Sequence, residues 1–313
     1  MDFVSEVAEN IYMIAHHPED SIYRFQAFFI DGDKPTLIEP GPARFIPNVI
    51  EGLGKLGYDA STLSYIIPTH IHADHCGGTG HLAQYAPEAK IIAHEKGARH
   101  LVNPEKMMAA TKDSWGDDFE SEIGEAIPVP EERIVQVKGG ETINLGKRSL
   151  SVVYSPGHAR HHICIFDAEG GELFCGEALG YLLPGEEIML LPTVSPPVYD
   201  VDVVLDTIRR LKELEPSLIL FSHYGISHDA ARCLDVAAEN VKSWGDITLQ
   251  ALQNGENLEQ IKGRFSSIVE GYLPGRSPQF SLFMDWAKVG YSGYYIKKGL
   301  VKPESEIRDL PAT

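Results

Sequence analysis

Three histidines and an aspartate lie within six residues of this 313-residue chain, in the segment Thr69-His70-Ile71-His72-Ala73-Asp74-His75. Four polar groups in one short loop would repel each other or stay unsatisfied without a cation, so the segment predicts a metal site. In an extended backbone, residues two apart point to the same side, so His70, His72 and Asp74 can converge. His75 must then turn toward a neighbouring point. One short loop therefore offers ligands for two nearby metal positions.

Three later segments each place one more metal-binding side chain at the end of an expected strand. These side chains are His158 after residues 150–154, Glu177 after residues 172–175 and His223 after residues 218–221. Loops at strand ends are the usual place for site residues on a rigid scaffold. With the first segment they give five imidazoles and two carboxylates. This donor set suits Zn²⁺, Mn²⁺ or Fe²⁺ better than Ca²⁺ or Mg²⁺.

The segment THIHADH resembles the HxHxDH signature of the metallo-β-lactamase-fold hydrolase superfamily. The later segments SPGH, FCGE and FSHYG resemble the remaining ligand motifs of that family, in the family's order, and the resemblance covers roughly residues 8–225. It implies an α/β fold, the αββα sandwich, in which two sheets pack face to face with helices outside. The implied ligands are His70, His72 and His158 for the first metal and Asp74, His75 and His223 for the second.

Two acidic positions depart from the family pattern. Glu177 stands where the family usually has an aspartate that bridges both metals. The longer side chain allows a bridge from a displaced backbone or ligation of one metal only, and we expect contact with both ions. Glu39 also stands where the family usually has aspartate, and we expect it to hydrogen-bond the ligand loop.

The resemblance implies a hydrolase of the glyoxalase II-like and lactonase-like branch. The expected cofactor is two divalent transition-metal ions, with Zn²⁺ as the first choice and Fe or Mn as alternatives. Two such ions about 3.5–4 Å apart can share and activate a water. The resulting dinuclear-metal-bound hydroxide would attack an ester, thioester or lactone. Two other functions stay open: a mononuclear iron sulfur dioxygenase similar to persulfide dioxygenases, and a non-catalytic metal-binding regulatory protein.

Some side chains near the expected ligands are candidates for catalytic roles. Asp74 could orient the hydroxide while also binding metal. His161 and His162 face opposite ways if their stretch is extended, so one of them can contact substrate; His162 is the choice and His161 the alternative. Tyr181, just after Gly180, is a candidate donor to the oxyanion or the substrate.

The elements that must position these residues alternate between β-rich runs and helices over the first two thirds of the chain. The expected strands are residues 11–15, 25–30, 36–39, 65–67, 90–93, 133–137, 150–154, 162–166, 172–175 and 218–221. The pattern then becomes helical, with a stripe over 230–244, helices at 247–252, 258–265 and 281–289, and a β-like run at 291–296. We therefore expect a catalytic core over residues 1–225 and a helical C-terminal extension over 226–313 packed on the core.

Composition limits the partners. The chain has 27 Lys and Arg against 45 Asp and Glu, a formal net charge of −18, so we expect no nucleic-acid and no membrane partner. The four cysteines form no CxxC pair, which favours reduced, buried thiols in a cytoplasmic protein. Cys76, next to His75, is expected to pack rather than to act as a nucleophile. The expected partner is a small-molecule substrate, and the C-terminal extension would form one wall of its cleft or the interface of a homodimer.

Overall fold

The structure is a computed structural model that describes residues 3–16, 24–183, 185, 187–196 and 199–302. The chain divides into two units. The first comprises residues 1–155, 161–176 and 216–228, and the second comprises residues 156–160, 177–215 and 229–313. The expected division at residues 225 and 226 stays a prediction.

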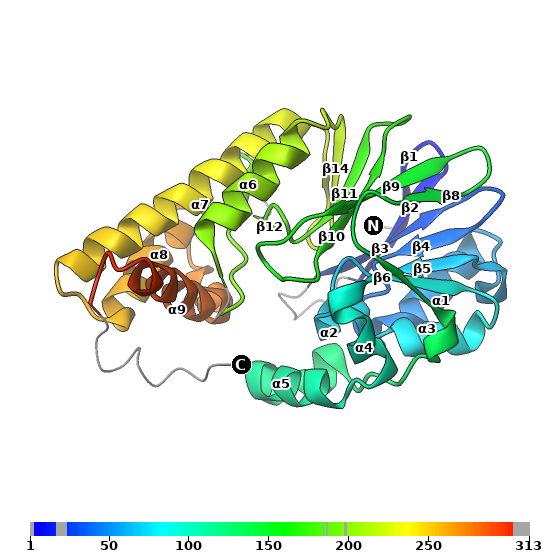
Figure 1. The fold of residues 1–313 in the computed structure, drawn as a ribbon, viewed down its shortest axis with the longest axis horizontal. Coiled ribbons are helices and arrows are strands. Elements are labelled where there is room, and N and C mark those ends of the chain that lie inside the picture. The colour runs from blue at the N-terminus through cyan, green and yellow to red at the C-terminus, as the bar shows by residue number, and fades with distance from the viewer. Residues whose placement is uncertain (1–2, 17–23, 184, 186, 197–198, 303–313) are drawn as a thin grey trace. The chain divides into compact units, whose positions relative to one another are not determined.

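Two β-sheets make up most of the first unit (Figure 1). Seven strands follow one another across the larger sheet in chain order: β1 (Val4–Ala8), β2 (Ile11–His16), β3 (Phe25–Ile30), β4 (Thr36–Ile38), β5 (Tyr65–Ile67), β6 (Lys90–His94) and β7 (Ile134–Val137). The pairs from β1 to β4 are antiparallel. The pairs from β4 to β7 are parallel, so the carboxyl ends of β4 and β5 meet at one edge of the sheet.

The second sheet has six strands. In spatial order they are β15 (Ile226–Ser227), β14 (Leu218–Phe221), β11 (Glu172–Gly176), β10 (Ile163–Asp167), β9 (Ser149–Tyr154) and β8 (Thr142–Asn144). Only the β11 and β14 pair is parallel among these strands. Apolar side chains of both sheets form one core, in which the rings of Phe28 and Phe174 lie 5.5 Å apart. The sheets therefore pack face to face, as expected.

Helices of the first unit follow the strands of the larger sheet. They are α1 (Ile46–Lys55), α2 (Ala73–Cys76), α3 (Thr79–Tyr85), α4 (Glu95–Val102) and α5 (Glu105–Trp115), with short 3-10 and π turns between them. Helix α1 buries Val49 and Leu53 at helical spacing, and its Gly52 lies directly against Ile14 of β2. This close approach fixes α1 on one face of the larger sheet.

The second unit is mainly helical. It contains the hairpin of β12 (Tyr181–Leu183) and β13 (Met189–Leu191) and the helices α6 (Val201–Lys212), α7 (Ala230–Gln253), α8 (Leu258–Tyr272) and α9 (Ser281–Lys297). The Trp244 ring of α7 stacks on Phe265 of α8 at 4.1 Å. Among the described residues, no helix is both long and apolar enough to cross a membrane.

All ten expected strands form, with bounds that differ by at most one residue at either end. Two expectations for the C-terminal part are wrong. Residues 230–244 and 247–252 belong to the single helix α7, which tolerates Gly245 because the hydroxyl of Tyr295 packs against it. The β-like run 291–296 is helical, because Tyr291 and Tyr295, four residues apart, both become buried in the second unit. Tertiary packing here overrides the β preference of aromatic residues.

Candidate metal centre

The ligand loop follows β5 and is held from two sides. Its first residue, Thr69, donates its backbone N–H to Oε1 of Glu39 (3.0 Å) and accepts at its carbonyl from the N–H of Ile163 (2.8 Å), which begins β10. The backbone of Gly176, at the end of β11, lies so close to Thr69 and His162 that a Cβ would clash with both side chains. Two strands of the smaller sheet therefore fix where the loop begins.

Asp74, His75 and His223 form one cluster within the first unit. Their ligand atoms all lie within 4.8 Å of one another. Nε2 of His75 lies 3.3 Å from Nε2 of His223, and Oδ2 of Asp74 lies 3.4 Å from the first nitrogen and 3.8 Å from the second. Two nitrogens bound to one tetrahedral Zn²⁺ at about 2.0–2.1 Å would lie about 3.3 Å apart. The cluster thus has the spacing of a metal site.

The Nδ1 atoms of His75 and His223 face away from the cluster, and the hydrogen bonds that they make show which nitrogen of each ring carries the hydrogen. Nδ1 of His75 lies 2.7 Å from Oε2 of Glu39, and Nδ1 of His223 lies 2.6 Å from the carbonyl oxygen of Arg24. Both oxygens only accept, so each Nδ1 carries the hydrogen. In the neutral rings the two Nε2 lone pairs then point toward the same place, beside the Asp74 carboxylate. This arrangement favours a bound cation.

Helix α2 explains why Asp74 belongs to this cluster. An extended loop would bring Asp74 together with His70 and His72, whereas the family resemblance grouped it with His75 and His223, and the structure agrees with the second grouping. The helix begins at Ala73, and the N–H groups of His75 and Cys76 donate to the His72 carbonyl. The alternation of an extended backbone therefore ends at His72.

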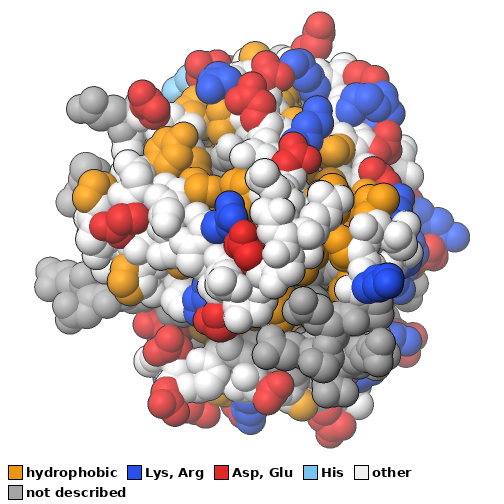
Figure 2. Space-filling view, turned by 90° about the vertical axis from the view of Figure 1, so that its left-hand side faces the viewer, with side chains coloured by type: hydrophobic (Ala, Val, Ile, Leu, Met, Phe, Trp, Pro, Cys, Tyr) orange, Lys and Arg blue, Asp and Glu red, His pale blue; other side chains and the backbone are white. Residues whose placement is uncertain are grey.

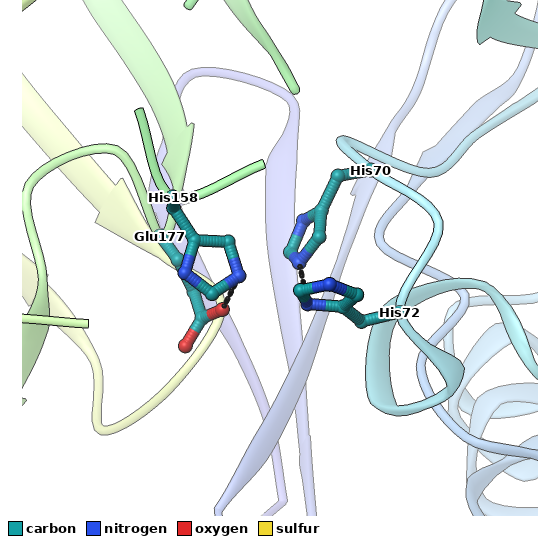
Figure 3. A group of neighbouring side chains, drawn as sticks. All are labelled: His70, His72, His158 and Glu177. Carbon is teal, nitrogen blue, oxygen red and sulfur yellow. Dashed lines mark hydrogen bonds and ion pairs between the residues drawn. The ribbon is translucent and has the colours of Figure 1, made fainter. Parts of the chain in front are cut away.

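His70 and His72 form a second pair of donors in the same loop (Figure 3). Nε2 of His70 lies 3.1 Å from Nδ1 of His72, and the other nitrogen of His70 lies 3.1 Å from the Thr69 hydroxyl. His162 is fully buried and stacks on His70 with ring centres 4.9 Å apart, whereas Nδ1 of His161 accepts the backbone N–H of Ile71. His162 thus packs on an expected ligand, and His161 fastens the loop.

His158 and Glu177 belong to the second unit, where they contact each other (Figure 3). Nε2 of His158 lies 2.7 Å from Oε2 of Glu177, and its Nδ1 lies 3.4 Å from the carbonyl oxygen of Thr193. If Nδ1 carries the hydrogen, Nε2 and the carboxylate are both acceptors, so they need a proton or a metal ion between them. The Thr193 hydroxyl also donates to the Glu177 carbonyl (2.9 Å).

The segment that carries His158 is anchored on α6. Gly157 has a φ of +146°, and its Cα lies against Val204, where a Cβ would come within 2.8 Å of that side chain. The Thr207 hydroxyl donates to the Pro156 carbonyl (2.6 Å). The glycine of the SPGH segment is therefore needed for a close approach to the helix.

Two further candidates are buried. Tyr181 opens β12, and its ring lies 4.8 Å from that of Phe283 in α9; its role as a donor to substrate stays a prediction. Cys76 is buried with Sγ 3.5 Å from Sδ of Met107, and burial raises the pKa of its thiol far above the ordinary value. A protonated, packed thiol is a poor nucleophile, in agreement with the packing role expected for Cys76.

The sequence did not predict two residues that hold the donors. Thr69 directly precedes the first histidine, so its position was a usable signal. Thr193 lies 35 residues from His158 and 16 from Glu177, and no motif marks it. Only the folded chain after the hairpin brings this threonine to the His158 ring and to the Glu177 backbone carbonyl.

The comparisons with known proteins point to one family. A model of the metallo-beta-lactamase superfamily matches residues 26–223, which include all seven expected ligands. The chain is 29% identical over 167 residues to the metallo-beta-lactamase fold-containing protein ST1585 of Sulfurisphaera tokodaii, a match that covers 52% of this chain and 61% of that protein. It is 28% identical over 171 residues to a hydroxyacylglutathione hydrolase of Synechococcus, covering 55% and 49%. The chain thus spans less than two thirds of the length of these curated relatives.

Solved structures show the same fold. ST1585 has a TM-score of 0.62 at 25% identity, with 75% of this chain and 86% of that chain covered. The metallo-beta-lactamase family protein TTHA1429 of Thermus thermophilus has a TM-score of 0.68 at 19% identity, with 94% and 95% covered. These likenesses confirm the expected αββα fold class.

Proposed function

Because the chain belongs to the metallo-β-lactamase superfamily, we propose that it is a metal-dependent hydrolase that acts on an ester, thioester or lactone with water activated at a dinuclear centre. The observation that carries the proposal is the cluster of Asp74, His75 and His223. Its 3.3 Å nitrogen spacing and its converging lone pairs suit a divalent transition metal.

The first metal would be held by the remaining donors. In the proposal His70, His72 and His158 bind this ion and Glu177 binds both ions, as the order of the family's ligand motifs implies. Support comes from the donor chemistry: imidazole nitrogens with carboxylates suit Zn²⁺, with Fe²⁺ and Mn²⁺ as alternatives. The contact between His158 and Glu177 adds to it, because these two acceptors need a cation or a proton.

The chain's own residues would prepare the reaction. Bound divalent ions lower the pKa of a water and polarise a carbonyl. Glu39 orients the His75 ring, the Arg24 carbonyl orients His223, and Thr193 holds His158 and Glu177 together. Asp74 would also orient the attacking water, and His162 and Tyr181 are the proposed contacts to substrate. Rigid ligands of this kind lower the cost of reorganisation during the reaction.

The substrate is proposed to be a small molecule. One relative carries the name hydroxyacylglutathione hydrolase, which favours acyl transfer to water over phosphodiester cleavage. The chain has 45 acidic residues against 27 basic ones, and this negative net charge argues against a nucleic-acid substrate. A cytoplasmic location belongs to the same proposal, since all four cysteines are buried and free. A homodimer remains a further expectation.

Metal analysis combined with a substrate panel tests the proposal. Natively purified protein should contain two transition-metal ions per chain and hydrolyse at least one thioester, lactone or carboxylic ester, and chelation should abolish turnover. His75→Ala should lose turnover, whereas His228→Ala, an exposed histidine, should keep it. One iron per chain with oxidation of a persulfide would replace the hydrolase with the sulfur dioxygenase.

A further inference from the structure

Residues at four turns of the first unit line a cavity of about 420 Å³. The turns join β1 to β2, β3 to β4, β8 to β9 and β10 to β11. The ligand loop lies at the other end of the same sheets. Strand β10 begins at Ile163, whose N–H donates to the Thr69 carbonyl of that loop, and it ends at Asp167 in the cavity wall. Four residues of a strand span about 13 Å, so the cavity is separate from the candidate metal centre.

The wall of the cavity is polar and acidic. Only two of the lining residues carry an aliphatic side chain, whereas six are acidic and three are basic. Two of the basic side chains already have acceptors. Arg148 pairs with Asp167 at 3.0 Å, and Lys34 donates to the carbonyl of Asn144 (2.9 Å). The wall therefore favours a positively charged ligand over an anion.

Glu172 provides a buried acceptor in this wall. The residue is 6% exposed, and its Oε2 is buried without a hydrogen-bond partner in the described part of the chain. The backbone of Gly170, which also lines the cavity, lies so close to this carboxylate that a Cβ would clash with both oxygens. Burial raises the pKa of Glu172 more than the charge of Arg148 lowers it, since Arg148 pairs with Asp167.

The other carboxylates in the described part of the chain are either paired or exposed. Glu39, Asp167 and Glu177 are also buried, and each lies within 3.0 Å of a side-chain nitrogen. The remaining acidic side chains reach the surface, and Figure 2 shows one face on which they are mixed with basic and uncharged ones. A buried carboxylate without a cation makes the folded protein less stable. A bound cation would remove this cost at Glu172.

We propose that the cavity binds a small organic cation whose ammonium group pairs with Glu172. A charged N–H donor satisfies the buried Oε2 and forms a charge-assisted hydrogen bond. Asp33 and Glu169 are exposed in the same wall and can hold a second ammonium group, so a short alkyl diamine suits the cavity. The cavity is also within the usual size range of small-molecule sites.

A divalent metal ion suits the cavity less well. Among the described residues, groups of three or more metal-binding side chains with ligand atoms within 4.8 Å of one another occur only at the candidate metal centre. The carboxylates of the cavity do not converge in this way. An organic cation needs fewer convergent oxygens, because each ammonium group carries three separate donors.

Isothermal titration of the natively purified protein with 1,4-diaminobutane tests the proposal. At pH 7.5 and about 0.15 M NaCl, which screens loosely held surface cations, we expect one site with a Kd below about 1 mM. Glu172→Gln should weaken binding at least tenfold, because the amide has nearly the same shape and no charge. Glu51→Gln is the matched control, since Glu51 is an exposed acid of α1 outside the cavity. Uncharged 1,4-butanediol should not bind.

Thermal unfolding gives a second measurement. The diamine should raise the Tm of the wild type and leave that of Glu172→Gln unchanged, because a ligand that binds only the folded chain stabilises it. Glu172→Asp keeps the charge on a shorter side chain, so it should bind the diamine more tightly than Glu172→Gln does.

Three results would overturn the proposal. They are equal affinity in Glu172→Gln and wild type, an equal loss in Glu51→Gln, and binding of calcium chloride that is tighter than that of the diamine and depends on Glu172. The site is independent of the proposed hydrolase, because neither measurement involves turnover.

Discussion

The carboxylate of Glu39 bonds with two parts of the ligand loop at once, with Oε2 2.7 Å from Nδ1 of His75 and Oε1 3.0 Å from the backbone nitrogen of Thr69. Glu39 is 2% exposed and has a φ of +61°, a conformation that costs a non-glycine residue of order 1 kcal/mol or more. The surrounding structure keeps this strained backbone, and the strain places a carboxylate where two donors converge. Glu39 is therefore a positioning residue for His75.

Glu39→Gln should weaken metal binding about 10- to 100-fold, the usual effect of losing a partner of a metal-bound histidine. An amide has one acceptor oxygen, so its NH₂ group would face either the Thr69 N–H or the His75 N–H. Competition titration with a chromophoric chelator measures the affinity. Glu141→Gln is the matched control, since Glu141 also accepts two backbone N–H groups, from Lys138 and Gly139. Equal affinities for wild type and Glu39→Gln would contradict the positioning role.

His223→Ala should lower the metal content from two ions per chain to about one. The variant removes one of the two imidazoles of the cluster and leaves Asp74, His75 and the proposed bridge from Glu177, a donor set that holds Zn²⁺ more weakly. Elemental analysis after dialysis against a weak chelator measures the content, and His228→Ala should still bind two ions. Retention of both ions by His223→Ala would show that His223 is no ligand.

Short-range patterns account for most of the site that the sequence predicted. The run from His70 to His75 is local, and HxHxDH marks it without help from the fold. The extended-backbone argument misplaced Asp74, which the motif had grouped with His75 and His223, because the sequence does not state where the four-residue helix α2 begins. The role of Thr193 is set by a hairpin that comes after Glu177, so no local pattern could predict it.

The fold shows the same division between local and long-range information. Apolar runs bounded by glycine, proline or aspartate, such as Phe25–Ile30, predicted their strands well. Five strands were not expected: β1, β8, β12, β13 and β15. Strands β1, β8 and β15 are short and only partly apolar, and β12 and β13 are apolar but only three residues long, so pairing with a neighbour defines each of them. Tyr291 and Tyr295 were assigned to a β-like run because their burial against α7 depends on residues about 50 positions away.

Glu177→Asp and Glu177→Gln test whether this carboxylate contacts both ions. We expect the aspartate variant to keep two metals and part of the activity, because the charge is retained. The glutamine variant should bind metal about tenfold more weakly or worse, since a neutral amide does not offset the repulsion between two cations. Isothermal titration with Zn²⁺ measures both. Loss of metal in Glu177→Asp would instead mean that the longer side chain sets the metal spacing.

Cys76→Ala should keep the turnover within about twofold and lower the free energy of unfolding by about 1 kcal/mol. The thiol is buried against Met107, and burial raises its pKa, so it contributes packing rather than a thiolate. Steady-state kinetics and thermal unfolding measure the two effects separately. A variant that keeps its metal and loses all activity would require a covalent thiol mechanism.

Glu172→Gln should make the protein more stable at neutral pH and leave its stability unchanged in acid. Glu172 is 6% exposed, and burial, with the nearby charge of Asp167, raises the pKa of its carboxyl group. Because the folded pKa lies above the unfolded one, the unfolded chain loses the proton first as the pH rises. The stabilisation from the neutral carboxyl is thus present below about pH 4.3 and is lost as the pH rises through the folded pKa.

Calorimetry of the metal-free Glu172→Gln variant at pH 7.5 should give a Tm a few degrees above that of the wild type, which for a chain of this size corresponds to roughly 1 kcal/mol in the free energy of unfolding. The two proteins should not differ at pH 3.5. Glu169→Gln, an exposed residue of the same turn, should change neither value, and a lower Tm for Glu172→Gln at pH 7.5 would show that the buried carboxylate is stabilised by its surroundings.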